Sequence, residues 1–160
     1  MSSSSFGPPN PPEITGALSP VRQLSVFLHN RVGALLGLVR LMNEHSIEVL
    51  GLSLQDSADL TLVRMIVSDP DKAQLELTHQ GSSCAIKDVV VVELREASHD
   101  LAKALAALLG AEINVHHSYP LLVRPHDRAL FALYLDDCEV GGESLSRSGF
   151  KVLSQDELSR

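Results

Sequence analysis

The seven histidines and two cysteines are the side chains of this sequence with the most varied chemistry. His116 and His117 are adjacent in a strand-like segment, so their side chains point to opposite faces and cannot chelate one metal ion together. A site built from His116, His99 and Cys84 would need the fold to join three distant segments. The sequence has no P-loop, Rossmann glycine pattern, nucleophile elbow or HExxH motif. We therefore expect no metal, no cofactor and no catalytic residue.

The residues best suited to binding a ligand form the segment Asn30-Arg-Val-Gly33, between a strand-like and a helix-like stretch. A glycine lets the backbone approach a ligand closely. Free N–H groups at the start of the following helix, together with the helix dipole, favour a carboxylate. Asparagine and glycine are equally common in turns that bind nothing. Both interpretations stay open.

Apolar periodicity predicts the elements that position this loop. In the first half we expect strands over 24–28, 47–54, 60–67 and 84–86, and helices over 35–45 and 72–80. In the second half we expect strands over 89–94, 113–123, 130–135 and 150–153, and helices over 100–109 and 139–148. The order β-α-β-β-α-β therefore occurs twice. This predicts an α+β fold of two ferredoxin-like βαββαβ units, each an antiparallel sheet with its helices on one face.

A comparison of the sequence with itself supports the repeat. An offset of 66 residues places Leu35 on Leu101, and after the first hairpin an offset of 68 places Gly81 on Gly149. A single two-residue insertion thus aligns both halves, including the glycines that end a helix in each. We expect a disordered tail over residues 1–20, a first unit over 21–87 and a second unit over 88–160.

The expected strands are apolar on both faces. Leu60 and Ile66 share one face, while Val63 and Met65 share the other. Strands of this kind are buried on both sides. We therefore expect the two units, or two chains, to pack together, and we predict a homodimer or larger assembly.

Composition excludes several classes of function. The formal net charge is −7 and no segment concentrates Lys and Arg, so we expect no nucleic-acid partner. No apolar run approaches the roughly 18 residues of a membrane span, so we expect no membrane partner. No secretory signal is visible, and two cysteines without a CxxC spacing suit a reduced compartment, so we expect a cytoplasmic protein.

Several segments resemble the ACT domain family. Leu24-Ser-Val-Phe-Leu-His-Asn-Arg-Val-Gly-Ala-Leu35 and Ile47-Glu-Val-Leu-Gly-Leu-Ser53 resemble the opening of an ACT domain, and Ala111-Glu-Ile-Asn-Val115 is similar to the second of these strands. Gly149-Phe-Lys-Val-Leu-Ser154 resembles the end of small stand-alone tandem ACT proteins. The resemblance extends from residue 22 to about residue 158.

The resemblance implies regulation by a small ligand, usually an amino acid, at an interface between two ACT units. The ligand-binding residues it implies are Asn30, Val32, Gly33, Ala34 and Leu35, with Leu50, Gly51 and Leu52 from the partner unit. Val32 stands where the family usually has proline, which leaves the loop less rigid. We expect a non-catalytic regulatory protein that acts on a partner, such as an enzyme. The alternative is a structural or interaction module, or a small regulatory subunit of a metabolic enzyme, with no ligand of its own.

The second unit departs from the family pattern more strongly. Ser98-His99-Asp100 replaces the glycine-containing turn, and Asp100 adds a negative charge where a ligand carboxylate would bind. We expect Asp100 to cap its helix instead, so that this copy is structural.

Overall fold

A computed structural model describes residues 19–29 and 33–159 of the chain. It contains the two predicted βαββαβ units. The first unit consists of β1 (Val21–His29), α1 (Ala34–Glu44), β2 (Val49–Asp56), β3 (Leu60–Val67), α2 (Pro70–His79) and the start of β4 (Cys84–Leu94). The second unit consists of the end of β4, α3 (Ala97–Gly110), β5 (Val115–Pro120), the short 3-10 turn η1 (Pro125–Asp127), β6 (Ala129–Leu135), α4 (Cys138–Arg147), β7 (Val152–Leu153) and α5 (Gln155–Leu158). The tail expected over 1–20 lies outside the described residues, apart from Ser19 and Pro20.

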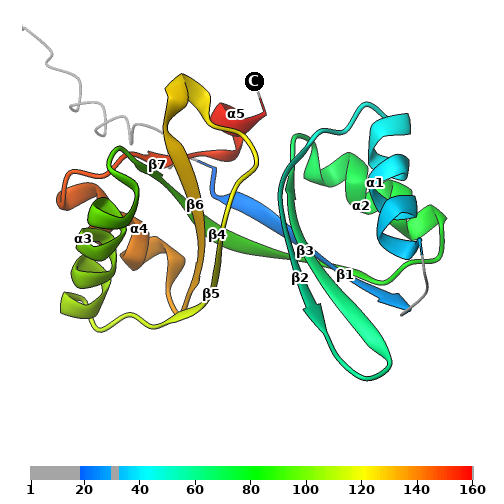
Figure 1. Ribbon diagram of the computed structural model, residues 1–160, viewed down its shortest axis with the longest axis horizontal. Helices are drawn as coiled ribbons and strands as arrows, with labels where there is room; N and C mark the ends of the chain where they lie inside the picture. Colours follow the sequence, from blue (N-terminus) through cyan, green and yellow to red (C-terminus); the bar gives the residue numbers. More distant parts are fainter. Residues whose placement is uncertain (1–18, 30–32, 160) are drawn as a thin grey trace, which may run out of the picture.

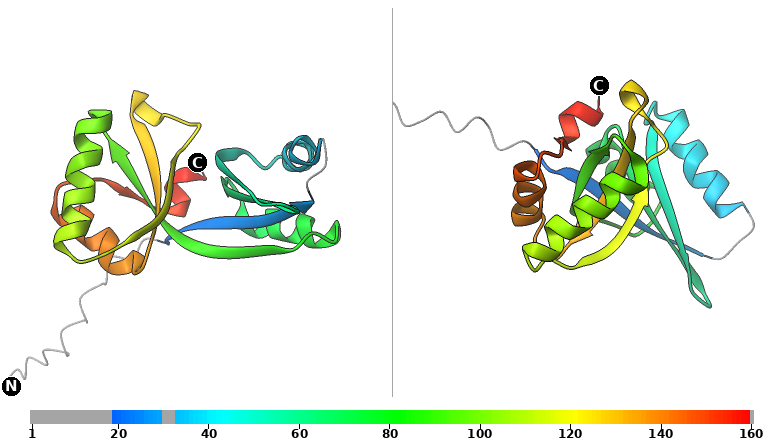
Figure 2. Two further views of the ribbon diagram at one scale, coloured as in Figure 1. Left: turned by 60° about the horizontal axis from the view of Figure 1, so that its bottom comes forward. Right: turned by 60° about the vertical axis from the view of Figure 1, so that its left-hand side comes forward.

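One strand, β4, belongs to both units and crosses the middle of the molecule (Figure 1, Figure 2). It pairs with β1 through residues 84–89 and with β6 and β7 through residues 90–94. The prediction of separate strands over 84–86 and 89–94 was wrong. Lys87 and Asp88 stay in the ladder because they pair with Gln23 and Arg22. The strand order is β2-β3-β1-β4-β6-β5, with β7 beside β4.

The helices cover the outer faces of the molecule and the sheets face each other inside. Figure 1 shows α1 and α2 on the outside of the first unit and α3 and α4 on the outside of the second. Two separate cores lie between helices and sheet. The first joins Met42 and Leu77 to Leu24, and the second joins Leu108 and Leu145 to Leu133. Each unit therefore buries the apolar stripes of its own two helices.

A third core lies between the two sheets and explains why the strands are apolar on both faces. Val63 and Met65 pack under the helices, whereas Ile66 faces the second unit. The members of this third core include Val21, Leu50, Ile66, Val91, Tyr119, Leu121 and Leu130. The predicted packing partner of the first unit is thus the second unit of the same chain.

Direct backbone contacts also join the units. Gly51 forms an isolated antiparallel bridge with Leu121, and the Leu122 N–H donates to the Leu50 carbonyl over 2.7 Å. A Cβ atom on Gly51 would lie 3.1 Å from Leu121 Cγ, so glycine allows this close approach. The strand expected over 113–123 is shorter for the same reason, because β5 ends where Leu121 and Leu122 turn toward the first unit.

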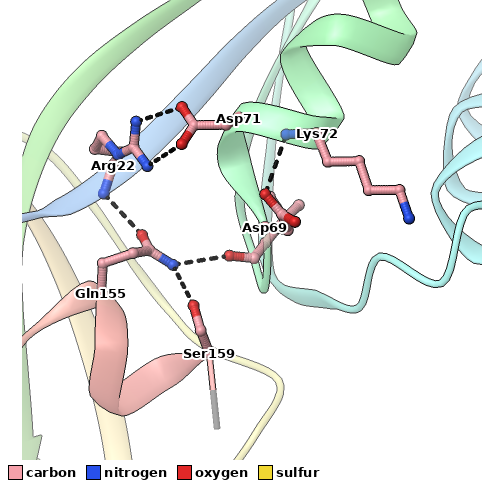
Figure 3. A network of polar contacts seen from close by, with 7 residues as sticks. Arg22, Asp69, Asp71, Lys72, Gln155 and Ser159 are labelled. Atoms are coloured by element: carbon pink, nitrogen blue, oxygen red, sulfur yellow. Dashed lines mark hydrogen bonds and ion pairs between the residues drawn. The ribbon is translucent and has the colours of Figure 1, made fainter.

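The short helix α5 holds the end of the second unit against the first (Figure 3). Gln155 is only 5% exposed; its side-chain oxygen accepts from the Arg22 N–H over 3.1 Å, and its amide nitrogen donates to the Val67 carbonyl over 3.1 Å. Arg22 in turn forms a two-pronged ion pair with Asp71, at 2.7 and 3.1 Å. A buried, fully paired amide fixes the position of this helix, because leaving its partners unpaired would cost free energy.

Candidate functional site

The start of α1 is the part of the predicted site that the structure describes best. Gly33 occupies the N-cap position with φ 88°, a left-handed conformation that glycine adopts readily. It has no side chain to cap the helix, and the first turn contains no acidic residue. Ala34 and Leu35, in this first turn, are partly exposed. The first N–H groups of α1 are therefore suited to an anionic ligand.

Two other predicted site residues, Asn30 and Val32, lie outside the described residues.

The first turns of α2 and α4 differ from that of α1. Asp69 accepts a hydrogen bond from the Lys72 N–H over 3.1 Å, and Asp137 accepts one from the Val140 N–H over 3.0 Å. Each of these helices also has an acidic residue in its first turn, Asp71 or Glu139. Their N-termini are capped by the chain itself.

The corresponding loop of the second unit is closed. The Asp100 carboxylate accepts from the backbone N–H groups of Arg95 and Glu96, over 2.8 and 3.0 Å. These backbone hydrogen bonds hold the pKa of Asp100 below its usual value, and the bond from Glu96 has the largest effect. The prediction that Asp100 begins and caps its helix was wrong. Helix α3 begins at Ala97, and its N-cap residue, Glu96, makes no side-chain cap hydrogen bond. Asp100 lies in the first turn, and its carboxylate bonds back to the two residues that precede the helix.

The strand residues of the predicted site lie apart from Gly33 within this chain. Leu50 is buried in the core between the sheets, and Gly51 contacts Leu121. Leu52 lies opposite Met65 on the next strand, β3, and Met65 lies opposite Leu24 on β1. Leu24 precedes the end of β1 by five residues, or about 17 Å along a strand. The structure therefore brings Gly33, Ala34 and Leu35 together, and separately Leu50, Gly51 and Leu52, but does not join the two groups.

The histidines on β5 have structural partners. His116 forms an ion pair with Asp136. His117 stacks on Tyr134 with ring centroids 4.9 Å apart and bonds to Gln23 over 3.2 Å. Burial, with help from nearby cations, lowers the pKa of His117 to about 4, so the ring is neutral at pH 7. Among the residues that the structure describes, no three His, Cys, Asp or Glu side chains are placed to hold one metal ion.

The pKa values of the two cysteine thiols are raised. Burial raises the pKa of Cys84 to about 11 and also raises the pKa of Cys138. The Cys138 thiol donates to the Asp88 carbonyl over 3.2 Å, although it opens a helix. Neither thiol has the lowered pKa of a reactive cysteine.

Two hollows that the sequence does not predict share Glu93 as a lining residue. One, of about 250 Å³, lies within the second unit and includes Arg95 and Lys103. The other, of about 500 Å³, lies between the units and includes Glu48 and Arg124. Glu93 itself is buried, with its carboxylate 2.6 Å from Arg128. The one signal in the sequence is the two-residue insertion after the second strand of the second unit, which falls in the wall of the larger hollow.

None of the helices among residues 19–29 and 33–159 is both long and apolar enough to cross a membrane.

Comparisons with known proteins support the predicted family. A family model described as an ACT domain pair matches residues 19–160. The structure is similar to that of protein BT0572 from Bacteroides thetaiotaomicron, with a TM-score of 0.81 and 26% identity, covering 89% of this chain and 98% of that one. Comparison with curated protein sequences gives no match.

Two more distant structures share the fold. They are the regulatory subunits of aspartate kinase from Thermus thermophilus, in the ligand-free form, and from Thermus flavus. Their TM-scores are 0.58 and 0.54 at 15% and 12% identity, over 82% and 83% of this chain and 94% and 95% of theirs. The doubled βαββαβ unit and the family match over residues 19–160 agree with each other, and we conclude that the chain belongs to the ACT domain family, as a pair of ACT domains.

Proposed function

We propose that this protein is a non-catalytic regulatory module that binds a small metabolite, of the amino-acid class, at the start of α1. The observation that carries the proposal is the difference between the helix starts. Gly33 gives α1 no side-chain cap and its first turn has no acidic residue, whereas a carboxylate already occupies the corresponding loop of the second unit. The similarity to regulatory subunits of aspartate kinase supports a regulatory role acting on a partner enzyme.

In this proposal the ligand carboxylate accepts hydrogen bonds from the first N–H groups of α1, and the helix dipole adds to the attraction. The proposed contacts are Asn30, Val32, Gly33, Ala34 and Leu35. Leu50, Gly51 and Leu52 enter the proposal from a partner unit in a second copy of the chain. The protein would then be a homodimer, and light scattering after size-exclusion chromatography that finds only monomer at micromolar concentration would contradict this part.

A cytoplasmic location is also part of the proposal. Both cysteines are free thiols, as is usual for proteins of a reducing compartment.

Isothermal titration against the twenty amino acids tests the binding site. The informative variant is Ala34→Asp, because Ala34 is the residue that the repeat aligns with Asp100. A carboxylate there competes with a ligand carboxylate, so we expect the affinity to fall about tenfold or more. Ser98→Asp is the matched control, since it adds the same charge to the first turn of α3. Equal affinity in the wild type and Ala34→Asp would reject the site.

A ligand-free interaction module is the second candidate. It is favoured by large apolar side chains on the outer helices, with Leu36 52% and Leu109 78% exposed. Absence of heat and of any thermal shift with all twenty amino acids would favour this candidate over the first.

A further inference from the structure

The smaller hollow, of about 250 Å³ within the second unit, is lined by more cationic than acidic residues. The cationic residues are Arg95, Lys103, Arg128 and Lys151, and the acidic ones are Glu93 and Asp100. The whole chain, in contrast, has a formal net charge of −7. The hollow therefore concentrates positive charge on a protein that is acidic as a whole, and a concave site with one sign of charge attracts small ions of the opposite sign.

Three of these cations surround Glu93 at one end of the sheet. The Arg128 guanidinium is 2.6 Å from the Glu93 carboxylate. Lys151 lies directly before β7 and beside Glu93, whose N–H donates to the Lys151 carbonyl over 3.0 Å. The Lys151 ammonium group is 3.6 Å from Glu157. Arg95 and Arg128 are the first residues beyond the last pair of the β4–β6 ladder, one on each strand, so their side chains start from neighbouring positions.

The fourth cation, Lys103, comes from helix α3. Its position is linked to the strand end through Asp100, whose carboxylate accepts from the Arg95 N–H over 2.8 Å. The pKa of Asp100 is lowered most by the backbone hydrogen bond from Glu96, and the charge of Lys103 adds to this effect. Lys103 therefore lies within electrostatic range of a carboxylate that is bonded to the end of β4.

Both carboxylates of the hollow already have partners within the chain. Glu93 is buried and paired with Arg128, and Asp100 accepts from two backbone N–H groups. Arg95 and Lys103 are exposed, and neither forms an ion pair with another residue that the structure describes. With four cations and two carboxylates, the hollow has two positive charges in excess. An anion with about two negative charges would match them.

The fold does not require cations at these positions. With the offsets of the internal repeat, the four cations align with His29, Gly37, Leu60 and Ser83 of the first unit, none of which is Lys or Arg. Glu93 lies opposite Leu130 in the sheet. Their counterparts Phe27 and Leu62 also lie opposite each other, so the sheet pairing agrees with the offsets. The first unit thus forms an equivalent sheet without this cluster, which leaves ligand binding as a reason for it.

We propose that this hollow binds a phosphate group, either inorganic phosphate or the phosphoryl group of a small phosphomonoester, through Arg95 and Lys103 with Arg128 and Lys151 beside them. A phosphoryl group carries about 1.5 to 2 negative charges at pH 7 and has three strong acceptor oxygens. Guanidinium groups donate to phosphate oxygens in pairs, and a lysine contributes a point charge. The hollow is smaller than the roughly 300–1,000 Å³ of pockets for drug-sized ligands, so it suits a compact anion. The site does not depend on the function proposed above.

Isothermal titration of the full chain with inorganic phosphate and with glycerol 3-phosphate tests the inference. Sodium acetate at the same ionic strength is the control anion. We expect at least one of the two phosphate compounds to bind and acetate not to bind. An affinity for inorganic phosphate equal to or above that for glycerol 3-phosphate assigns the site to free phosphate. A higher affinity for glycerol 3-phosphate assigns it to a phosphomonoester.

Two variants locate the site. Arg95→Gln and Lys103→Gln should each weaken binding about tenfold, because each removes a charged hydrogen-bond donor. Both residues are exposed, so thermal melting of the variants should match the wild type. Arg128 is not suited to this test, because its removal would leave the buried carboxylate of Glu93 unpaired.

Arg40→Gln, an exposed change on α1, is the matched control and should leave binding unchanged. Ala34→Asp should also leave it unchanged, since the start of α1 belongs to the other unit. The inference is overturned if neither phosphate compound binds, if acetate binds as well as they do, if both Gln variants of the site bind normally, or if Arg40→Gln weakens binding as much as those variants. Loss of phosphate binding in Ala34→Asp, with normal binding in both site variants, would also overturn it and would locate the anion at the start of α1.

Discussion

The β1–α1 and β4–α3 connections occupy the same place in the two units, yet their helices start differently. In the first unit Gly33 begins α1 without a side-chain cap. In the second, Asp100 accepts two backbone hydrogen bonds, and α3 starts three residues earlier in the sequence than Asp100. In the second unit an acidic side chain of the first helical turn thus bonds to the connection that precedes the helix. A duplicated unit can keep its fold while the residues at one helix start change.

The prediction with the largest expected effect concerns whether the two units unfold independently of each other. Met42 and Leu108 occupy equivalent buried positions, 66 residues apart. Replacing either with Ala should lower the free energy of unfolding by about 2–5 kcal/mol. Because β4 and the third core join the units, we expect both variants to shift a single transition. Urea unfolding followed by circular dichroism and by tyrosine fluorescence measures this.

Tyrosine fluorescence gives that experiment its control. Both tyrosines, Tyr119 and Tyr134, belong to the second unit, and the chain has no tryptophan. Met42→Ala changes only the first unit. If the two units unfold together, the tyrosine fluorescence of this variant must nevertheless change at a lower urea concentration than in the wild type. An unchanged tyrosine midpoint with a split dichroism curve would mean that the two units unfold separately.

A smaller effect concerns His117, which lies at the inter-unit contact and has Gly51 as its counterpart in the first unit. Its pKa is lowered to about 4 in the folded protein, while the unfolded chain takes up a proton near pH 6.5. The contribution of His117 to the free energy of unfolding is therefore fully present above pH 6.5 and is lost as the pH drops from 6.5 to 4. The ring is half-buried, so we expect a loss of only about 1 kcal/mol.

Replacing His117 with Gln should remove that part of the pH dependence while keeping a polar partner for Gln23. Thermal melting at pH 7, 5.5 and 4.5 measures the slope, and His29→Gln at the exposed end of β1 serves as the control. Identical slopes in the wild type and both variants would contradict the assignment to His117.

The smallest effect sharpens the comparison of the two loops. Asp100 has a lowered pKa in the folded state, so its contribution is present above the unfolded pKa and lost as the pH falls through the folded value. Asp100→Asn should therefore flatten the decline of the melting temperature below pH 4. Asp59→Asn, in the exposed β2–β3 turn, is the control. A steeper acid decline in Asp100→Asn than in the wild type would contradict a stabilising role of this carboxylate in the β4–α3 connection.

Much of the fold was predictable because its signals are local. Alternating and helical apolar spacing located the strands and helices, although α2 begins at Pro70, two residues before the expected start. The limits of β4, β5 and α3 were not predictable in the same way. Each depends on a partner that apolar spacing does not reveal: β1 for the middle of β4, Leu50 for the end of β5, and the Asp100 carboxylate for the residues just before α3.

For the candidate site, the sequence by itself determined that Gly33 precedes a helix and that the second unit has an acidic residue, Asp100, in the aligned segment. Glycine is favoured at a helix boundary because of its backbone freedom. Only the tertiary structure decided that Leu50 and Gly51 pack on the second unit, and that Glu48 and Arg124 border one hollow. Contacts between residues more than 70 positions apart depend on how two finished sheets meet, and apolar periodicity specifies which face is buried but not against what.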